Sequence, residues 1–156
     1  MAVRLVNGLF DPQTEQAAFV AGRTDAGALV SFVGYCRNRT AENSVDELFL
    51  DHHSPFTESE IARILGTVST RYELLDALII HRVGMMRPGD PIVLVAVLSP
   101  HRNQAFEAVR ILMDYLKTDA PLWKKEIGPE GQRWIEPSDD DYARRAAAER
   151  DSSGRH

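Results

Sequence analysis

The sequence predicts an α+β fold. Its hydrophobic pattern predicts a strand, a helix, two strands, a helix, two strands, a helix and a short hairpin, without the strict alternation that a doubly wound sheet needs. The chain has 156 residues, which fits one domain of roughly 100–200 residues. It contains neither a phosphate-binding glycine loop nor a dinucleotide-binding glycine fingerprint. The common nucleotide-binding α/β folds are therefore disfavoured.

The first half of the chain is predicted to place one helix and two strands after an N-terminal strand. Residues 11–22 have the pattern of a short helix that a glycine ends. Residues 27–37 are rich in β-forming residues and predict a strand with a bulge at Gly34. Residues 45–52 alternate as a strand does, across the polar loop 38–44. We expect these two strands to pair as a hairpin.

A helix and a second hairpin are predicted next. Residues 57–60 have the form of a capping box, and apolar residues then recur at helical spacing at Ile61, Ile64, Leu65, Val68 and Tyr72. Residues 75–83 and 92–98 are apolar and flank a turn at residues 88–90. We expect both to be strands, the second of them buried.

The second half begins with the strongest helix signal in the chain. Ser99 is predicted as its N-cap and Pro100 as its first residue, and the helix should end near Thr118. Residues 122–126 and 133–135 are predicted as short extended pieces between glycines and prolines. We expect a single domain over residues 1–136 and a polar, partly disordered tail over residues 137–156.

The amino-acid composition indicates which classes of partner are disfavoured and in which cellular compartment the protein is expected. Lys and Arg total 18 against 23 Asp and Glu, a net charge of −5, which argues against a general surface for nucleic acid. A single cysteine, Cys36, excludes an internal disulfide and fits a reducing compartment. No secretory signal and no apolar run of about 20 residues is present. We expect a cytoplasmic protein without membrane contact.

Basic residues at both ends of the helix after Ser99 are candidate ligands for an anion. His101 and Arg102 lie in the predicted first turn, where free N–H groups and the helix dipole favour an anion, although both could simply be solvated. Lys117, Lys124 and Lys125 form the densest lysine group. If they converge, they lower one another's pKa and supply a neutral amine; alone, Lys117 would merely complement the helix dipole.

Four other residues are weaker candidates. Arg37 ends a strand, a common position for a ligand-binding residue, but is equally consistent with a solvated side chain. His81 and Arg82 lie inside an apolar strand and favour a structural pair with satisfied hydrogen bonds. Cys36 is most consistent with inert packing. His52 and His53 lack nearby acidic or cysteine ligands at metal spacing, so no metal site is predicted.

Seven blocks of residues together resemble one known family, the MoaE family, which is the large catalytic subunit of molybdopterin synthase. The likeness runs in order from Val3 to Ile135, and the last block, with Trp123, is the most specific. The blocks are residues 27–38, 50–52, 81–84, 88–90, 99–102, 106–108 and 116–126.

The resemblance implies a fold, partners and a reaction. The fold would be of the α/β hammerhead type, with mixed and antiparallel sheets and a small additional hairpin subdomain. The chain would form a homodimer at the centre of a heterotetramer, each copy receiving the C-terminal Gly-Gly tail of a small ubiquitin-like sulfur carrier. As a sulfurtransferase it would move sulfur from the carrier's thiocarboxylate to cyclic pyranopterin monophosphate, giving the dithiolene of molybdopterin. No permanently bound cofactor is implied.

The resemblance also carries site residues to this chain. It implies that Lys117 and Lys124 are catalytic and that Arg37, His101 and Arg102 hold the substrate phosphate. Tyr35 and Asp119 depart from what relatives usually carry. The full set of implied substrate-binding residues is Tyr35, Cys36, Arg37, His101, Arg102, Lys117, Lys124, Lys125 and Glu126.

An alternative from another class uses the same residues. A non-catalytic module could bind an anionic ligand or a partner's C-terminal tail through these arginines, lysines and the histidine. Such a module would bind carrier or pterin without releasing a sulfurated product, so turnover separates the two interpretations.

Overall fold

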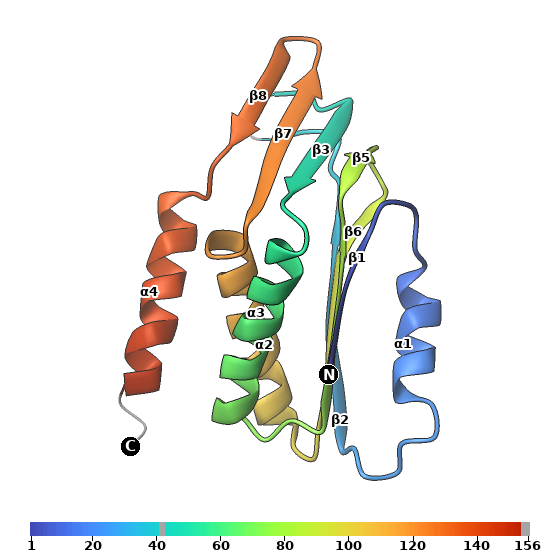
Figure 1. Cartoon of the computed structure of the whole chain (residues 1–156), viewed down its shortest axis with the longest axis vertical. Helices are drawn as coiled ribbons and strands as arrows, with labels where there is room; N and C mark the ends of the chain where they lie inside the picture. The colour runs from blue at the N-terminus through green and yellow to red at the C-terminus, as the bar shows by residue number, and fades with distance from the viewer. Residues whose placement is uncertain (41–42, 154–156) are drawn as a thin grey trace.

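The computed structural model describes residues 1–40 and 43–153, with side chains through residue 150. Eight strands and four helices occur in this part of the chain (Figure 1). They are β1 (Ala2–Val6), α1 (Pro12–Val20), β2 (Ala28–Tyr35), β3 (Glu47–His52), α2 (Phe56–Arg71), β4 (Asp76–Arg82), β5 (Gly84–Met86), β6 (Pro91–Ser99), α3 (Arg102–Thr118), β7 (Leu122–Gly128), β8 (Gly131–Ile135) and α4 (Asp139–Ser153).

The strands form two four-stranded sheets, and the predicted α+β class is confirmed. The first sheet has the order β1-β4-β6-β2, in which only the β1–β4 pair is parallel. The second has the order β5-β3-β7-β8 and is antiparallel throughout. The second sheet lies across one end of the first (Figure 1). The β7–β8 hairpin provides the expected additional subdomain.

The predicted hairpin of residues 27–37 with 45–52 is wrong. Strand β2 pairs with β6, while β3 pairs with β5 and β7 in the other sheet. The reason lies in β6, which is buried along most of its length, so that its backbone N–H and C=O groups need hydrogen-bonding partners on both edges. Strand β3 buries only Leu48 and Leu50, on one face. The expected irregularity is confirmed, since the β2 register shifts between Gly34 and Tyr35.

The second predicted hairpin is confirmed. Strands β4 and β6 pair antiparallel from Asp76 opposite Leu98 to His81 opposite Val93. Between them, the short strand β5 leaves the first sheet and joins the second through Leu48 and Met86. The hairpin connection therefore ties the two sheets together.

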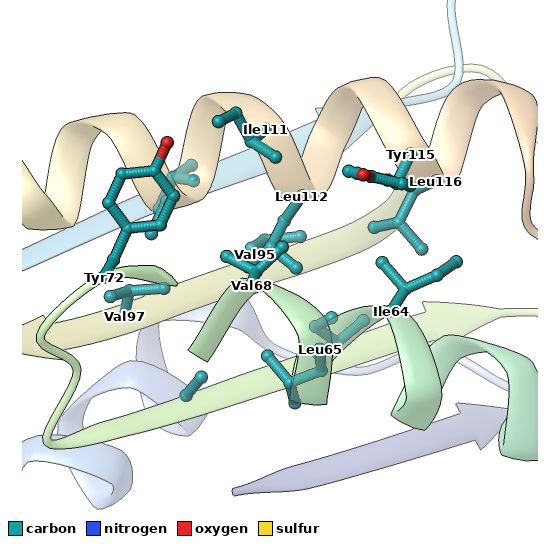
Figure 2. Close-up of a cluster of buried hydrophobic side chains, with 14 of the residues drawn as sticks. Ile64, Leu65, Val68, Tyr72, Val95, Val97, Ile111, Leu112, Tyr115 and Leu116 are labelled. Atoms are coloured by element: carbon teal, nitrogen blue, oxygen red, sulfur yellow. The ribbon is translucent and has the colours of Figure 1, made fainter. Parts of the chain in front are cut away.

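Helices cover both faces of the first sheet. Helices α2 and α3 pack on one face and build the largest core cluster, in which Val68, Leu112 and Val95 meet (Figure 2). Helix α1 lies on the opposite face (Figure 1), where Phe19 packs against Ile80 and Leu94. A smaller cluster under the second sheet joins Cys36, Leu48, Leu50 and Met86.

Both predicted helix caps serve a different purpose. Helix α2 begins at Phe56 without a side-chain cap, and the Thr57 hydroxyl instead accepts from the His53 N–H at 2.9 Å and donates to the Pro121 carbonyl at 3.0 Å. Helix α3 begins at Arg102 with His101 as its N-cap residue. The Ser99 hydroxyl donates to the Glu73 carbonyl at 2.7 Å. Each hydroxyl thus donates its hydrogen bond to a carbonyl that lies far away in the sequence.

Helix α4 occupies most of the segment for which we expected a partly disordered tail. Ser138 and Asp141 form a reciprocal capping box, with distances of 2.9 and 3.1 Å between side-chain oxygens and backbone nitrogens. The helix packs on α3 and buries Ala148 completely. This apolar contact and the cap explain the helix, because the segment's composition alone is strongly polar. Residues 154–156 of the expected tail lie outside the described residues.

No helix in the described part of the chain combines the length and the apolar character that crossing a membrane requires.

Candidate functional site

The candidate site lies where the first sheet, the end of α3 and the inner face of the second sheet meet. Lys124 stands opposite Leu50 and Glu126 opposite Leu48 in the β3–β7 pairing. Because directly opposed residues share a face of the sheet, both charged side chains point to the side that buries the two leucines. Glu126 is itself buried and receives a hydrogen bond from Arg133 at 3.3 Å.

Lys124 is the electrostatic centre of this region. Its pKa is lowered, first by burial and then by the positive charges of Lys117 and Arg37; Glu126 acts in the opposite direction. The structure therefore brings together three of the predicted cations, from the end of β2, the end of α3 and β7. A desolvated ammonium beside like charges releases its proton more readily, so Lys124 is suited to proton transfer.

Lys125 does not join this group, which answers for this residue the question of convergence that the sequence left open. Its ammonium nitrogen lies 5.5 Å from the ring centre of Phe49 and 5.2 Å from that of Trp134. The reason is the period of a β-strand, which sends neighbouring side chains to opposite faces. Lys125 thus belongs to the outer face of the second sheet, where cation–π contacts hold it.

His101 and Arg102 lie at the far end of α3 from Lys117. Fifteen residues separate Arg102 from Lys117, about 22 Å at about 1.5 Å per residue. Both side chains are exposed at the helix N-terminus, where free N–H groups favour an anion. Within one chain, the predicted site residues therefore form two separate groups.

Tyr35 is the last residue of β2, and Cys36 follows it. Both lead directly to Arg37, which belongs to the group around Lys124. Tyr35 is half exposed at the end of the strand. Cys36 is buried, its N–H donates to the Asp90 carbonyl at 2.9 Å, and its carbonyl accepts from the Gly89 N–H at 2.8 Å. Burial raises the pKa of the Cys36 thiol, so it stays protonated near neutral pH. This supports the packing interpretation of Cys36.

His81 and Arg82 are both buried, as expected for a structural pair, but among the described residues the buried Arg82 Nε has no hydrogen-bond partner, so the expected satisfaction is incomplete. The Arg82 guanidinium donates to Asp90 at 2.9 Å and to the Met85 carbonyl at 3.0 Å. His81 Nδ1 lies 2.9 Å from the Arg82 carbonyl. Burial, together with the positive charge of Lys124, lowers the pKa of His81 to about 4, although the hydrogen bond to the Arg82 carbonyl acts in the opposite direction. The imidazole is therefore neutral at pH 7, and it is a neighbour of Lys124 that sequence reasoning did not find.

A surface hollow lies beside the candidate site but is lined by other residues. Its polar lining residues are Asn7, Asp51, His52, Ser54 and Glu58. Its charged groups are acidic, which does not suit an anionic ligand. Among residues 1–40 and 43–153, no three histidine, cysteine or acidic side chains gather in a way that could hold a metal ion.

Comparison with known proteins gives consistent matches over most of the chain. The family model described as MoaE protein matches residues 6–119. The molybdopterin synthase catalytic subunit of Ralstonia nicotianae is 46% identical over 134 residues, 86% of this chain and 76% of that protein. The subunit of the same name from Pseudomonas aeruginosa is 43% identical over 143 residues, 92% and 95% of the two chains.

A solved structure supports the same relationship. The molybdopterin biosynthesis MoaE protein from Burkholderia ambifaria superposes with a TM-score of 0.77 at 39% identity, over 92% of this chain and 97% of that one. Helix α4 lies beyond the residues that the family model matches, whereas this alignment covers nearly the whole chain.

Proposed function

The chain belongs to the MoaE family, the catalytic subunits of molybdopterin synthase, and on this premise we propose that Arg37, Lys117, Lys124 and Glu126 form its sulfur-transfer site. Enzymes of this family are sulfurtransferases of molybdenum cofactor biosynthesis and act on a pyranopterin. The observation that carries the proposal is the desolvated Lys124 beside Lys117 and Arg37. The expected location is the cytoplasm, where the thiol of Cys36 stays reduced.

The proposed roles follow from position and charge. Lys117 is exposed at the end of α3, where an incoming carrier tail can reach it and have its acyl group polarised. Lys124 accepts or returns a proton at the carbon that receives sulfur, because its lowered pKa makes the neutral amine accessible. Arg37 binds the phosphate through charge-assisted hydrogen bonds. Because the carrier delivers the sulfur, no permanently bound cofactor is needed.

A second copy of the chain completes the phosphate site in this proposal. His101 and Arg102 are about 22 Å from Lys117 at about 1.5 Å per residue, too far to hold one small substrate together with it. Strand β2 is an edge strand whose Leu29, Phe32 and Tyr35 are exposed. An unpaired apolar edge of this kind invites pairing with another chain.

Antiparallel pairing of two β2 strands about a two-fold axis would join the separated groups. The strand starts beside Ser99, next to His101, and ends beside Pro91, next to Arg37. Reversing the direction in the partner therefore sets Arg37 of one chain near His101 of the partner subunit. Each of the two equivalent sites would then draw residues from both copies.

Turnover tests the proposal directly. The purified protein is mixed with a thiocarboxylated small carrier and cyclic pyranopterin monophosphate, and the dithiolene product is detected by mass spectrometry. We expect product from the native chain and a loss of more than about a hundredfold in kcat for Lys117→Ala, in the range typical of groups that act in the transition state. Arg63→Ala, which removes an exposed cation on α2, is the matched control.

Two results would contradict the proposal. Binding of carrier and pterin without any product would favour the non-catalytic module. Near-native turnover by Lys117→Ala, with the variant folded by circular dichroism, would remove Lys117 from the mechanism.

A further inference from the structure

Arg145 of helix α4 contacts the C-terminal end of α3 through two of its residues, Tyr115 and the C-cap residue Asp119. The Arg145 guanidinium carbon lies 3.8 Å from the ring centre of Tyr115. Its Nε and Nη2 donate to the same carboxylate oxygen of Asp119, at 3.0 and 2.9 Å. Glu149, one turn further along α4, lies 2.7 Å from Nη1. The Arg145 side chain is only 16% exposed, so these contacts are substantially shielded from water.

The two residues that Arg145 holds flank Lys117 in the sequence. Tyr115 and Asp119 are four residues apart and therefore share one face of the helix, the face toward α4. Lys117 is two residues from each, about 200° around the helix axis at about 100° per residue. Lys117 therefore lies off the face that Arg145 holds, and its positive charge acts on Lys124 of β7 as well as on Asp141 of α4.

Two effects oppose a fixed position of Lys117 in the last turn of α3. The last carbonyls of a helix lack intrahelical partners, so helix ends fray. Lys117 is also repelled by the like charge of Lys124, which together with Arg37 makes this a strongly positive region. Both effects favour movement of the exposed Lys117 away from the site.

Helix α4 supplies compensating negative charge near the same turn. Asp141 is buried and fixed by its capping box with Ser138 and by Arg144 at 2.6 Å. Burial acts to raise its pKa, but the hydrogen bonds from Ser138 and the positive charge of Lys117 outweigh that effect, so the pKa of Asp141 lies below its usual range. Asp141 is therefore ionised at neutral pH and attracts Lys117.

We propose that Arg145 is a positioning residue for sulfur transfer, holding the Tyr115–Asp119 turn so that Lys117 stays directed toward Lys124. The inference rests on the proposed role of Lys117. Arg145 itself does not touch the reacting atoms; it acts through the turn that carries Lys117.

The test measures steady-state turnover in the assembled complex with thiocarboxylated carrier. For Arg145→Ala we expect kcat to fall about tenfold with little change in the KM for the pterin, because misplacing a catalytic group costs rate more than binding. Arg145→Lys should recover part of the loss, since it keeps the charge but loses the planar group that stacks on Tyr115 and the fixed fork geometry of the two donors to Asp119. Arg150→Ala, which removes an exposed charge from the same helix, should match the native chain.

A double-mutant cycle separates positioning from general destabilisation. Asp119→Ala should lower kcat by a similar factor, and Asp119→Ala with Arg145→Ala should fall no further than either alone. All assays are run well below the melting temperature of each variant, so that a purely structural contact would lower the melting temperature and leave kcat unchanged.

The possible failures can be told apart. Native kcat in Arg145→Ala, or a loss confined to KM, would overturn the positioning role while Lys117→Ala remains inactive. Native kcat in Lys117→Ala would instead overturn the proposed function on which the inference rests.

Discussion

Lys124 owes its chemistry to its neighbours. The same residue type one position later, Lys125, lies on the other face of β7 against two aromatic rings. Lys124 is desolvated and close to other cations, and both effects lower its pKa. The alternation of one strand thus separates a candidate proton carrier from a lysine held by cation–π contacts.

Replacing Lys124 by arginine tests whether its proton matters. Arginine keeps the positive charge but does not deprotonate in proteins. If Lys124 must lose its proton, we expect Lys124→Arg to lose at least about a hundredfold in kcat. For the native chain, kcat should fall as the pH drops below the lowered pKa of Lys124. Native-like turnover by Lys124→Arg would show that only its charge is used.

His81 should make stability depend on pH. Its folded pKa is about 4, below the unfolded value of about 6.5. Between these values the unfolded chain binds a proton that the folded chain does not, so stability is lost as the pH falls from about 6.5 to about 4. From pH 7 to pH 5 this contribution amounts to about 2 kcal/mol.

Urea unfolding at pH 7 and pH 5 measures that loss. His81→Asn keeps an amide donor for the Arg82 carbonyl but does not titrate, so its pH dependence should be weaker by the same amount. His53→Asn, at an exposed histidine, should retain the native dependence. Equal pH dependence in the native chain and His81→Asn would contradict the assignment.

At the scale of elements, side chains with the pattern of helix caps instead join distant segments. Thr57 links the connection before α2 to Pro121, directly before β7. Ser99 links the end of β6 to Glu73, after α2. These hydroxyls lie on buried residues; each accepts from a nearby backbone N–H and donates to a carbonyl of a distant segment. They hold the helices to the strands that carry the candidate site.

Thr57→Val should therefore cost more than the loss of an ordinary cap. It leaves the His53 N–H and the Pro121 carbonyl without this partner, and each unsatisfied buried group costs about 1–3 kcal/mol. We expect the free energy of unfolding to fall by about 2–4 kcal/mol, from two such groups of about 1–3 kcal/mol each with partial relaxation. Ser59→Ala, which removes an exposed hydroxyl bonded within the same helix, is the control, and a Thr57→Val effect as small as that control would refute this role.

At the scale of the whole molecule, we propose that the two groups of predicted site residues form one site only between two copies of the chain. Mixed dimers test this requirement. One tagged chain carries Lys117→Ala and the other carries Arg102→Ala, and the dimer with both tags is purified and assayed with its carrier. If sites are shared, one site keeps Lys117 from one copy and Arg102 from the other, and about half of native turnover should return.

The corresponding homodimers are the controls, since each carries the same defect in both sites. A mixed dimer no more active than these homodimers would show that each chain builds its site alone. In that case His101 and Arg102 would serve a purpose other than holding the substrate of the Lys117 group.

The sequence by itself determined the elements and part of the site. Periodicity located α2, α3 and the buried strand β6, because one segment's own pattern of apolar residues decides which face it can bury. The bulge at Gly34 was also predictable from the local sequence. Arg37, Lys117 and Lys124 stood out as basic residues at the ends of elements in an acidic protein, and the resemblance to one family then gave them roles.

The tertiary structure alone decided how the elements meet. Strand β2 pairs with β6 and not with β3, because strand pairing depends on how much apolar surface the whole set of strands buries. The same holds for Thr57, Ser99 and Arg145, whose partners lie 64, 26 and 26 residues away. His81 and Lys124 belong to different sheets, so their proximity follows from the way the second sheet lies across the end of the first. Contacts between distant segments depend on the free energy of the whole fold, which cannot be inferred from the sequence pattern of one segment.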